Sequence, residues 1–134
     1  MELTRRHTRR LRCRIPGGDH APREARNILD RFDPTLEGRR RDDARLLLSE
    51  VVNNSVRHAA AGPDETVELT LSRSPRRLRV TVADCGGGFD QAVARQPFSA
   101  EREGGRGLFL LDAIADRWGV VNGRMTRVWF ELTT

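Results

Sequence analysis

The sequence predicts an α+β two-layer sandwich, in which a mixed, largely antiparallel sheet carries its helices on one face. Three observations support this fold class. A length of 134 residues suits one domain with a real hydrophobic core. Several short runs alternate apolar and polar residues, as half-buried strands do, whereas longer stretches place apolar residues at spacings of three and four, as helices do. Two pairs of the alternating runs are separated by turn residues, which favours antiparallel hairpins.

The first half of the chain is expected to contain one strand and two helices. Residues 11–15 alternate apolar and charged side chains and end at a Pro-Gly-Gly segment, which predicts a short half-buried strand. Residues 21–32 have a helical composition, with Pro22 acceptable in the first turn and Asp33-Pro34 as the stop. Residues 39–61 place apolar side chains on one helical face, and Gly62-Pro63 closes this helix.

The second half is expected to contain two hairpins and one helix. Residues 67–71 and 78–82 alternate around a turn, which predicts the first hairpin. Residues 86–107 contain six glycines and little periodicity, and a loop of this length in a compact domain is usually functional. Helical spacing resumes over residues 108–118. Residues 119–121 and 128–132 are expected to form a terminal hairpin around an Asn-Gly turn.

Composition excludes several classes of protein. All 24 basic residues are arginines, so a Walker A phosphate loop and Schiff-base chemistry, which need lysine, are excluded. The two cysteines and three histidines lack the spacing of a disulfide framework or a zinc site. No apolar run approaches the roughly 20 residues of a membrane span and no secretory signal is recognisable, so a cytoplasmic protein without a membrane partner is expected. We expect one domain over residues 11–134, after a basic lead at residues 1–10 whose order the sequence leaves open.

The net charge of +5 and the clustered arginines raise the question of a nucleic-acid partner. Arginines gather at residues 5–14, 39–41 and 76–79, but few aromatic residues accompany them and no motif that reads DNA or RNA is present. Solvated arginine-rich faces are therefore favoured over a nucleic-acid interface. An acidic protein partner is another use for such faces.

Three short motifs in a fixed order carry the chemical signal of the sequence. Glu50 and Asn54 lie one turn apart on the predicted helix 39–61, so they can meet a common ligand. An Asn side chain supplies a neutral oxygen for Mg²⁺, and Glu50 can accept a proton during attack on a γ-phosphate. Asp84 follows a predicted strand and can accept a hydrogen bond from an exocyclic amine, while Gly86 and Gly88 leave room for a flat ring.

The third motif opens the predicted helix 108–118. Gly105, Arg106 and Gly107 precede Leu108, and the free N–H groups and dipole of a helix start attract anions such as phosphates. Each motif also has a plain structural interpretation: an i,i+4 surface pair, an Asp-Gly turn and a loop-to-helix junction. Their occurrence together, in this order, favours a nucleotide site over coincidence.

The three motifs resemble the N box and the two glycine boxes of the Bergerat-type ATP-binding fold, the GHKL superfamily of gyrase, heat-shock chaperone ATPases and histidine kinases. The resemblance covers nearly the whole chain. Residues 48–59, 82–90 and 104–111 are similar in particular to the anti-sigma-factor serine kinases, which are small bacterial proteins. The match has two departures: an Asn53-Asn54 doublet, and Ser55 where alanine is usual.

The resemblance implies ATP and Mg²⁺ as cofactors and a role for each motif residue. Asn54 would hold Mg²⁺, Glu50 would be the catalytic base, and Asp84 would bind the adenine amine. Residues 89–104 would form the ATP lid. Thr126 falls where a late hydroxyl approaches the nucleotide in relatives, with a hydrogen bond inside its own hairpin as the alternative. The other nucleotide-binding positions implied are Gly86, Gly88, Gly105, Arg106, Gly107 and Leu108.

The function implied is that of an ATP-dependent protein serine/threonine kinase of the anti-sigma-factor type. Such a kinase phosphorylates a serine on an antagonist protein, regulates transcription by binding a sigma factor, and forms a homodimer. The alternative is a nucleotide-gated interaction module, in which ATP orders the lid and changes a partner-binding surface without phosphoryl transfer. A basic nucleic-acid binder is the least favoured interpretation.

Overall fold

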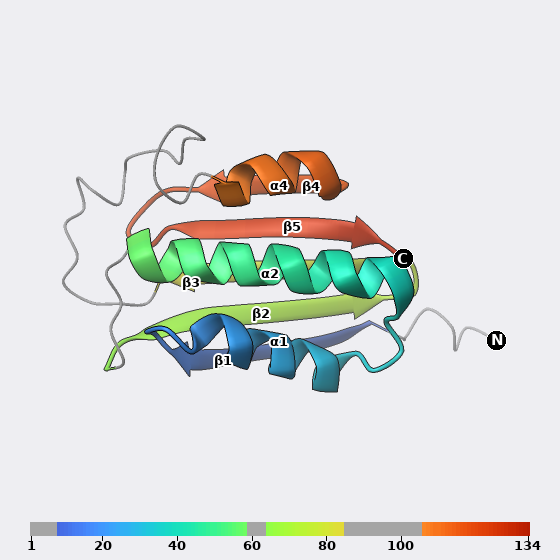
Figure 1. Cartoon of the computed structure of the whole chain (residues 1–134), viewed down its shortest axis with the longest axis horizontal. Coiled ribbons are helices and arrows are strands. Elements are labelled where there is room, and N and C mark those ends of the chain that lie inside the picture. Colours follow the sequence, from blue (N-terminus) through green and yellow to red (C-terminus); the bar gives the residue numbers. More distant parts are fainter. Residues whose placement is uncertain (1–7, 59–63, 85–105) are drawn as a thin grey trace.

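The computed structural model describes residues 8–58, 64–84 and 106–134. The strands are β1 (Arg9–Pro16), β2 (Thr66–Ser74), β3 (Arg77–Asp84), β4 (Arg117–Val121) and β5 (Arg127–Thr133), and the helices are α1 (Ala21–Phe32), α2 (Gly38–His58) and α4 (Arg106–Ile114). The strands form one sheet in the order β1-β2-β3-β5-β4, and every neighbouring pair is antiparallel. All three of these helices lie on one face of the sheet (Figure 1). The predicted α+β sandwich is confirmed, with an antiparallel sheet throughout the described strands.

The hydrophobic core fills the space between these helices and the sheet. Alternate residues of the three central strands point toward the helices, as the two-residue period of a strand requires. They are fully or almost fully buried: Val67, Leu69, Leu71, Leu78, Val80, Val82, Val128, Phe130 and Leu132. The facing stripe of α2 consists of Ala44, Leu47, Leu48, Val51 and Val52. Burial contributes about 1.5–3 kcal/mol for each large apolar side chain, so this contact fixes α2 across the middle of the sheet.

A buried carboxylate ends α1 and ties it to β2. Asp33 caps the helix by donating its N–H to the carbonyl of Leu29, at 2.9 Å. Its side chain accepts hydrogen bonds from Thr35 at 2.6 Å and from Arg73 at 2.7 Å, and Arg9 lies 3.6 Å away. Burial alone would raise the pKa of Asp33, but these hydrogen bonds and the two arginine charges together lower it below its ordinary value.

Element boundaries near the C-terminus differ from the sequence prediction. Helix α4 ends at Ile114, and residues 117–118 begin β4 rather than ending the helix, because Trp118 pairs with Phe130 across the sheet. The terminal hairpin turns over residues 122–126, which include the predicted Asn-Gly turn, and the carbonyl of Thr126 accepts a hydrogen bond from the N–H of Asp84 on β3. The helix start predicted at residue 108 lies two residues after the observed start.

Some predictions fall outside the described residues. These are the end of the predicted helix at residues 59–61, nearly all of the predicted loop 86–107, and residues 1–7 of the basic lead. The division into a lead and a domain at residue 11 stays a prediction, and β1 begins at Arg9. Among the helices of the described ranges, none is both long and apolar enough to cross a membrane.

Candidate functional site

The elements that carry the first two motifs meet at one end of the sheet, the left end in Figure 1. The C-terminal part of α2 carries Glu50 and Asn54, and β3 ends there at Asp84. Helix α4 begins at the same end. Helix α2 contacts both β3 and α4. The topology therefore brings together motifs that are separated by about thirty residues in the sequence.

Asp84 lies at the junction of these elements and is only 1% exposed. The hydroxyl of Ser55, on α2, donates a hydrogen bond to Oδ1 of Asp84 at 2.7 Å. The backbone N–H of Asp84 donates to the carbonyl of Thr126 at 3.1 Å. Burying a carboxylate without hydrogen-bond donors is costly, so these contacts hold Asp84 between α2 and the segment that leads into β5.

The sequence analysis did not predict a role for Ser55 in the site. It noted this residue only because alanine is usual at this position in the family. Its position contains a signal nevertheless. Ser55 follows Leu48, Val51 and Val52 at helical spacing, so it lies on the stripe of α2 that faces the sheet. A hydroxyl on a buried apolar stripe needs a buried polar partner, and Asp84 is that partner.

Glu50 and Asn54 share a face of α2, as the sequence predicts, but they differ in exposure. Asn54 is 6% exposed, whereas Glu50 and the neighbouring Asn53 are half-buried. Asn54 directly precedes Ser55, so the bond between Ser55 and Asp84 also fixes the backbone of Asn54 next to β3. The structure thus brings Asn54 and Asp84 to the same end of the molecule. Their roles as metal and adenine ligands stay predictions.

Thr126 is buried beside Asp84, in the segment that precedes β5. Its backbone carbonyl bonds to β3 rather than to its own hairpin partner β4. The next residue, Arg127, is the register partner of Ala83, so Thr126 lies opposite Asp84. The late hydroxyl predicted to approach a nucleotide therefore belongs to a residue at the same end of the sheet as Asp84.

The glycine boxes are described only in part. Gly86, Gly88, Gly105 and the predicted ATP lid at residues 89–104 lie outside the described residues. Arg106 and Gly107 are the first two residues of α4, so the third motif does lie at the start of a helix, as predicted. Leu108 is half-buried and packs against the core.

The donor groups at this end of the sheet fit a magnesium–nucleotide ligand. A carboxylate held in place by a hydroxyl donor offers an acceptor to an amine. An amide oxygen is a ligand that Mg²⁺ accepts when phosphates and waters supply the rest. A half-buried carboxylate one turn earlier on the same helix can exchange a proton with solvent or with a substrate hydroxyl.

Comparison with known proteins identifies the family of this fold. Residues 19–132 match a family described as "Histidine kinase-like ATPase domain". The chain is 33% identical over 87 residues to a protein named serine-protein kinase RsbW from Listeria monocytogenes, in an alignment that covers 56% of this chain and 54% of that protein. A protein of the same name from Staphylococcus epidermidis is 29% identical over 86 residues, with the same coverage. The chain thus spans about half the length of the curated relatives that it matches.

Proposed function

The chain belongs to the histidine kinase-like ATPase family, and from this premise we propose that it is an ATP-dependent protein serine/threonine kinase of the anti-sigma-factor type. One observation carries the nucleotide part of the proposal. The buried carboxylate of Asp84, bonded to Ser55, lies directly beside the helix that carries Asn54 and Glu50. A carboxylate so placed is a suitable acceptor for the adenine amine, and the amide of Asn54 is a suitable ligand for Mg²⁺.

The proposal gives Glu50 the role of the catalytic base. Its carboxylate would accept the proton of a serine hydroxyl on an antagonist protein, while bound Mg²⁺-ATP supplies the phosphoryl group. Thr126, Leu108, Arg106 and the glycines of the two boxes would surround the nucleotide. The curated relatives are named serine-protein kinases, which supports a protein as the substrate. The proposal further takes an antagonist protein or a sigma factor as the partner and a homodimer as the assembly.

The nucleotide site is tested by titrating variants with ATP and GTP, with and without Mg²⁺. Asn54→Ala should lose about tenfold or more of its Mg²⁺-dependent ATP affinity, since one metal ligand is removed. Asn53→Ala is the matched control, because it removes the adjacent, more exposed amide, and it should change ATP affinity by less than about threefold. Asp84→Asn should lose the preference for ATP over GTP. Unchanged affinities in both site variants would remove the assignment.

The kinase step is tested with labelled ATP and a candidate antagonist protein. Glu50→Gln should reduce phosphoryl transfer by about 10²- to 10⁴-fold, the usual contribution of a positioned base, while ATP affinity stays close to that of the wild type. Glu37→Gln is the control, because this exposed acid precedes α2 and lies outside the site. Undiminished transfer by Glu50→Gln would exclude Glu50 as the base. ATP binding by the wild type without transfer to any antagonist would instead favour the nucleotide-gated interaction module.

A further inference from the structure

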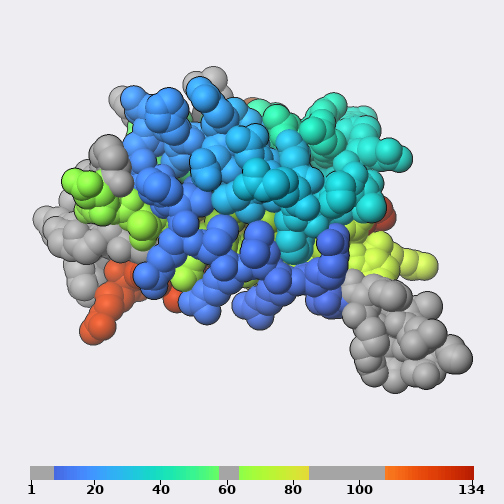
Figure 2. Space-filling view, turned by 90° about the horizontal axis from the view of Figure 1, so that it is seen from below, coloured from blue at the N-terminus to red at the C-terminus, as the bar shows by residue number. Residues whose placement is uncertain are grey.

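The sheet has a second face, which no helix covers within the described ranges; we call it the open face. It is formed by alternate residues of each strand, those that point away from α1, α2 and α4. Figure 2 views the molecule from the β1 edge. The side chains of β1, in dark blue, project there in a row on the side opposite to the helix layer.

Arginine dominates the open face. The strands contribute Arg10, Arg12 and Arg14 from β1, Arg77 and Arg79 from β3, Arg117 from β4, and Arg127 from β5. Only two carboxylates of the described strands, those of Glu68 and Glu131, point to the same side. The open face therefore has a large surplus of positive charge, which attracts anions and repels another surface of the same kind.

Both carboxylates are already paired with arginines. The side chain of Glu131 is only 5% exposed and lies 2.6 Å from Arg79 and 3.4 Å from Arg117. Glu68 lies 3.2 Å from Arg12. In the part of the chain that the structure describes, Arg10 and Arg127 form no ion pair. These two guanidinium groups are therefore available to an incoming anion.

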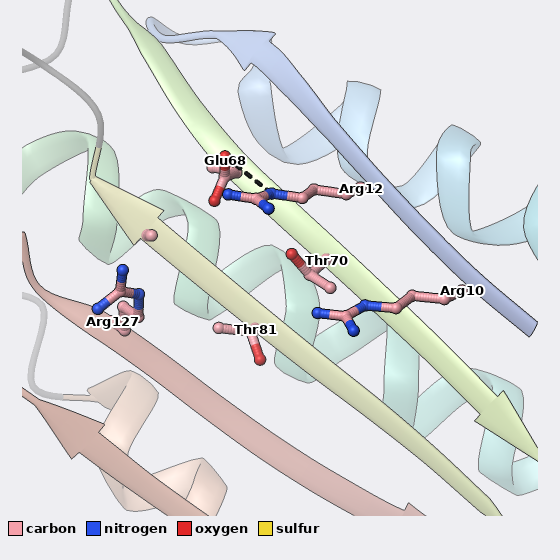
Figure 3. A pocket seen from close by; sticks show the side chains of 7 residues that line it. Arg10, Arg12, Glu68, Thr70, Thr81 and Arg127 are labelled. Carbon is pink, nitrogen blue, oxygen red and sulfur yellow. Dashed lines mark ion pairs between the residues drawn. The ribbon is translucent and has the colours of Figure 1, made fainter.

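A hollow of about 240 Å³ lies between these two arginines (Figure 3). Its floor is formed by Thr70 and Thr81, which are register partners on β2 and β3, and by Ala83. Glu68 also lines the hollow, where its carboxylate is paired with Arg12. One wall is formed by Arg12 together with Arg10 on β1, and both side chains extend over β2 toward the floor. The opposite wall is Arg127 on β5. Three strand spacings of about 4.8 Å separate the backbones of β1 and β5, which is about 14 Å, and the arginine side chains extend into this space from both walls.

The chemistry of the face favours a protein segment over a nucleic acid. Single-stranded nucleic acids need exposed aromatic rings on which their bases can stack. Trp129 is the aromatic residue of the described open face, and its ring already packs against Arg79 and Gly119. The guanidinium of Arg79 lies 4.2 Å from the ring centroid. The ring also packs so closely on Gly119 that a Cβ there would lie 2.7 Å from Nε1.

A second copy of the chain also fits this face poorly. Two open faces packed against each other would bring arginines against arginines, and like charges across an interface are unfavourable. Carboxylates are the natural complement, since a planar guanidinium forms two parallel hydrogen bonds with a carboxylate. The threonine hydroxyls of the floor can donate further hydrogen bonds to carboxylate oxygens.

We propose that the open face docks an acidic segment of a protein partner, whose carboxylates bind Arg10 and Arg127 over the threonine floor. The site is separate from the nucleotide site, because Ala83 lines the hollow whereas Asp84, the next residue, points to α2 on the other side of the sheet. The proposal goes beyond the proposed kinase function and holds whether or not the protein transfers a phosphoryl group.

The test uses the whole chain and a short fluorescein-labelled poly-glutamate peptide, with a glutamine–serine peptide of equal length as the uncharged probe. Fluorescence anisotropy should show binding of the acidic peptide only. The double variant Arg10→Glu/Arg127→Glu should weaken this binding at least about tenfold, which corresponds to about 1.4 kcal/mol. The matched control Arg23→Glu/Arg39→Glu makes the same change in net charge at exposed positions of α1 and α2. It should weaken binding less than about threefold, because distant exposed charges are screened.

Equal losses of peptide affinity in the two double variants would overturn the proposal. Binding would then depend on the net charge of the protein and not on where the arginines lie. Thr81→Glu is a second variant that leaves every arginine intact but places a carboxylate in the floor, and it too should weaken binding about tenfold. Single-stranded DNA that binds more tightly than the peptide at equal ionic strength would make the partner a nucleic acid. Dimerisation that is lost in Arg10→Glu/Arg127→Glu would make the face a contact between copies. Either result would contradict the proposal, whereas failure to bind ATP would concern the nucleotide site alone.

Discussion

Replacing Ser55 by alanine tests whether the bond between α2 and β3 organises the nucleotide end of the sheet. The Ser55 hydroxyl donates to Oδ1 of Asp84 at 2.7 Å, and the two residues are 3% and 1% exposed. A hydrogen bond to a charged group contributes about 1.5–3 kcal/mol. Water does not readily replace a donor at so buried a carboxylate. We therefore expect Ser55→Ala to lower the free energy of unfolding by about 1.5–3 kcal/mol at neutral pH.

Urea unfolding followed by circular dichroism measures this loss, and Ser49→Ala provides the control. Ser49 lies on the same helix, but its hydroxyl donates to the carbonyl of Arg45 within that helix at 2.7 Å, and it accepts a bond from Arg26 at 2.8 Å. The local bond supports the helix little, and Ser49 and Arg26 are only half-buried, so water can replace the hydroxyl as the partner of the guanidinium. The control should therefore lose less than about 1 kcal/mol. If Ser55→Ala is as stable as the wild type, or no less stable than Ser49→Ala, the bond to Asp84 does not organise this end.

Two further predictions concern parts of the fold outside the nucleotide end. Burial raises the pKa of Asp33, but its hydrogen bonds and arginine neighbours lower it by more. Its contribution to stability is therefore full above the ordinary Asp pKa of about 3.9 and is lost as the pH falls through the lower, folded-state pKa. Asp33→Asn should flatten the dependence of unfolding free energy on pH in that acidic range, and an unchanged slope would contradict this. Gly119→Ala should cost about 1–3 kcal/mol because the new Cβ would lie 2.7 Å from Trp129. Gly123→Ala, where the nearest atom lies 3.9 Å away, should cost less than about 1 kcal/mol, and equal thermal shifts in the two would refute the argument.

The elements that local signals define were predictable from the sequence. Helix α1 runs over Ala21–Phe32, the predicted range, because Pro22 is allowed in its first turn and Asp33 ends it. The apolar stripe of α2 and the alternation in β2 and β3 placed these elements to within three residues at their described ends. In each case the hydrophobic period and the terminating residue lie within one stretch of the chain, so no information from distant residues is required.

The elements that depend on distant partners were not predictable in the same way. Residues 115–118 continue a helical spacing, but Trp118 enters β4 because Phe130 is available as its partner across the sheet. The hydrogen bond between Ser55 and Asp84 joins residues 29 positions apart in the sequence. The residues around Ser55 do not indicate which buried carboxylate will accept its hydrogen bond. The predicted Glu50–Asn54 pair required only the helical repeat, so the sequence could indicate it, while its convergence with Asp84 required the topology of the sheet.

The alternation of strand residues separates the two functional surfaces that we propose. On β3, Asp84 points to α2 while Ala83 lines the hollow of the open face. On the neighbouring segment, Thr126 lies beside Asp84 while Arg127 forms a wall of the hollow. The strands that carry residues of both faces are β3 and β5, and their ladder is continuous from Ala83 to Arg77. Binding of an acidic peptide and of ATP should therefore be independent, since no element in the described part of the chain shows two packing arrangements that both ligands could bias.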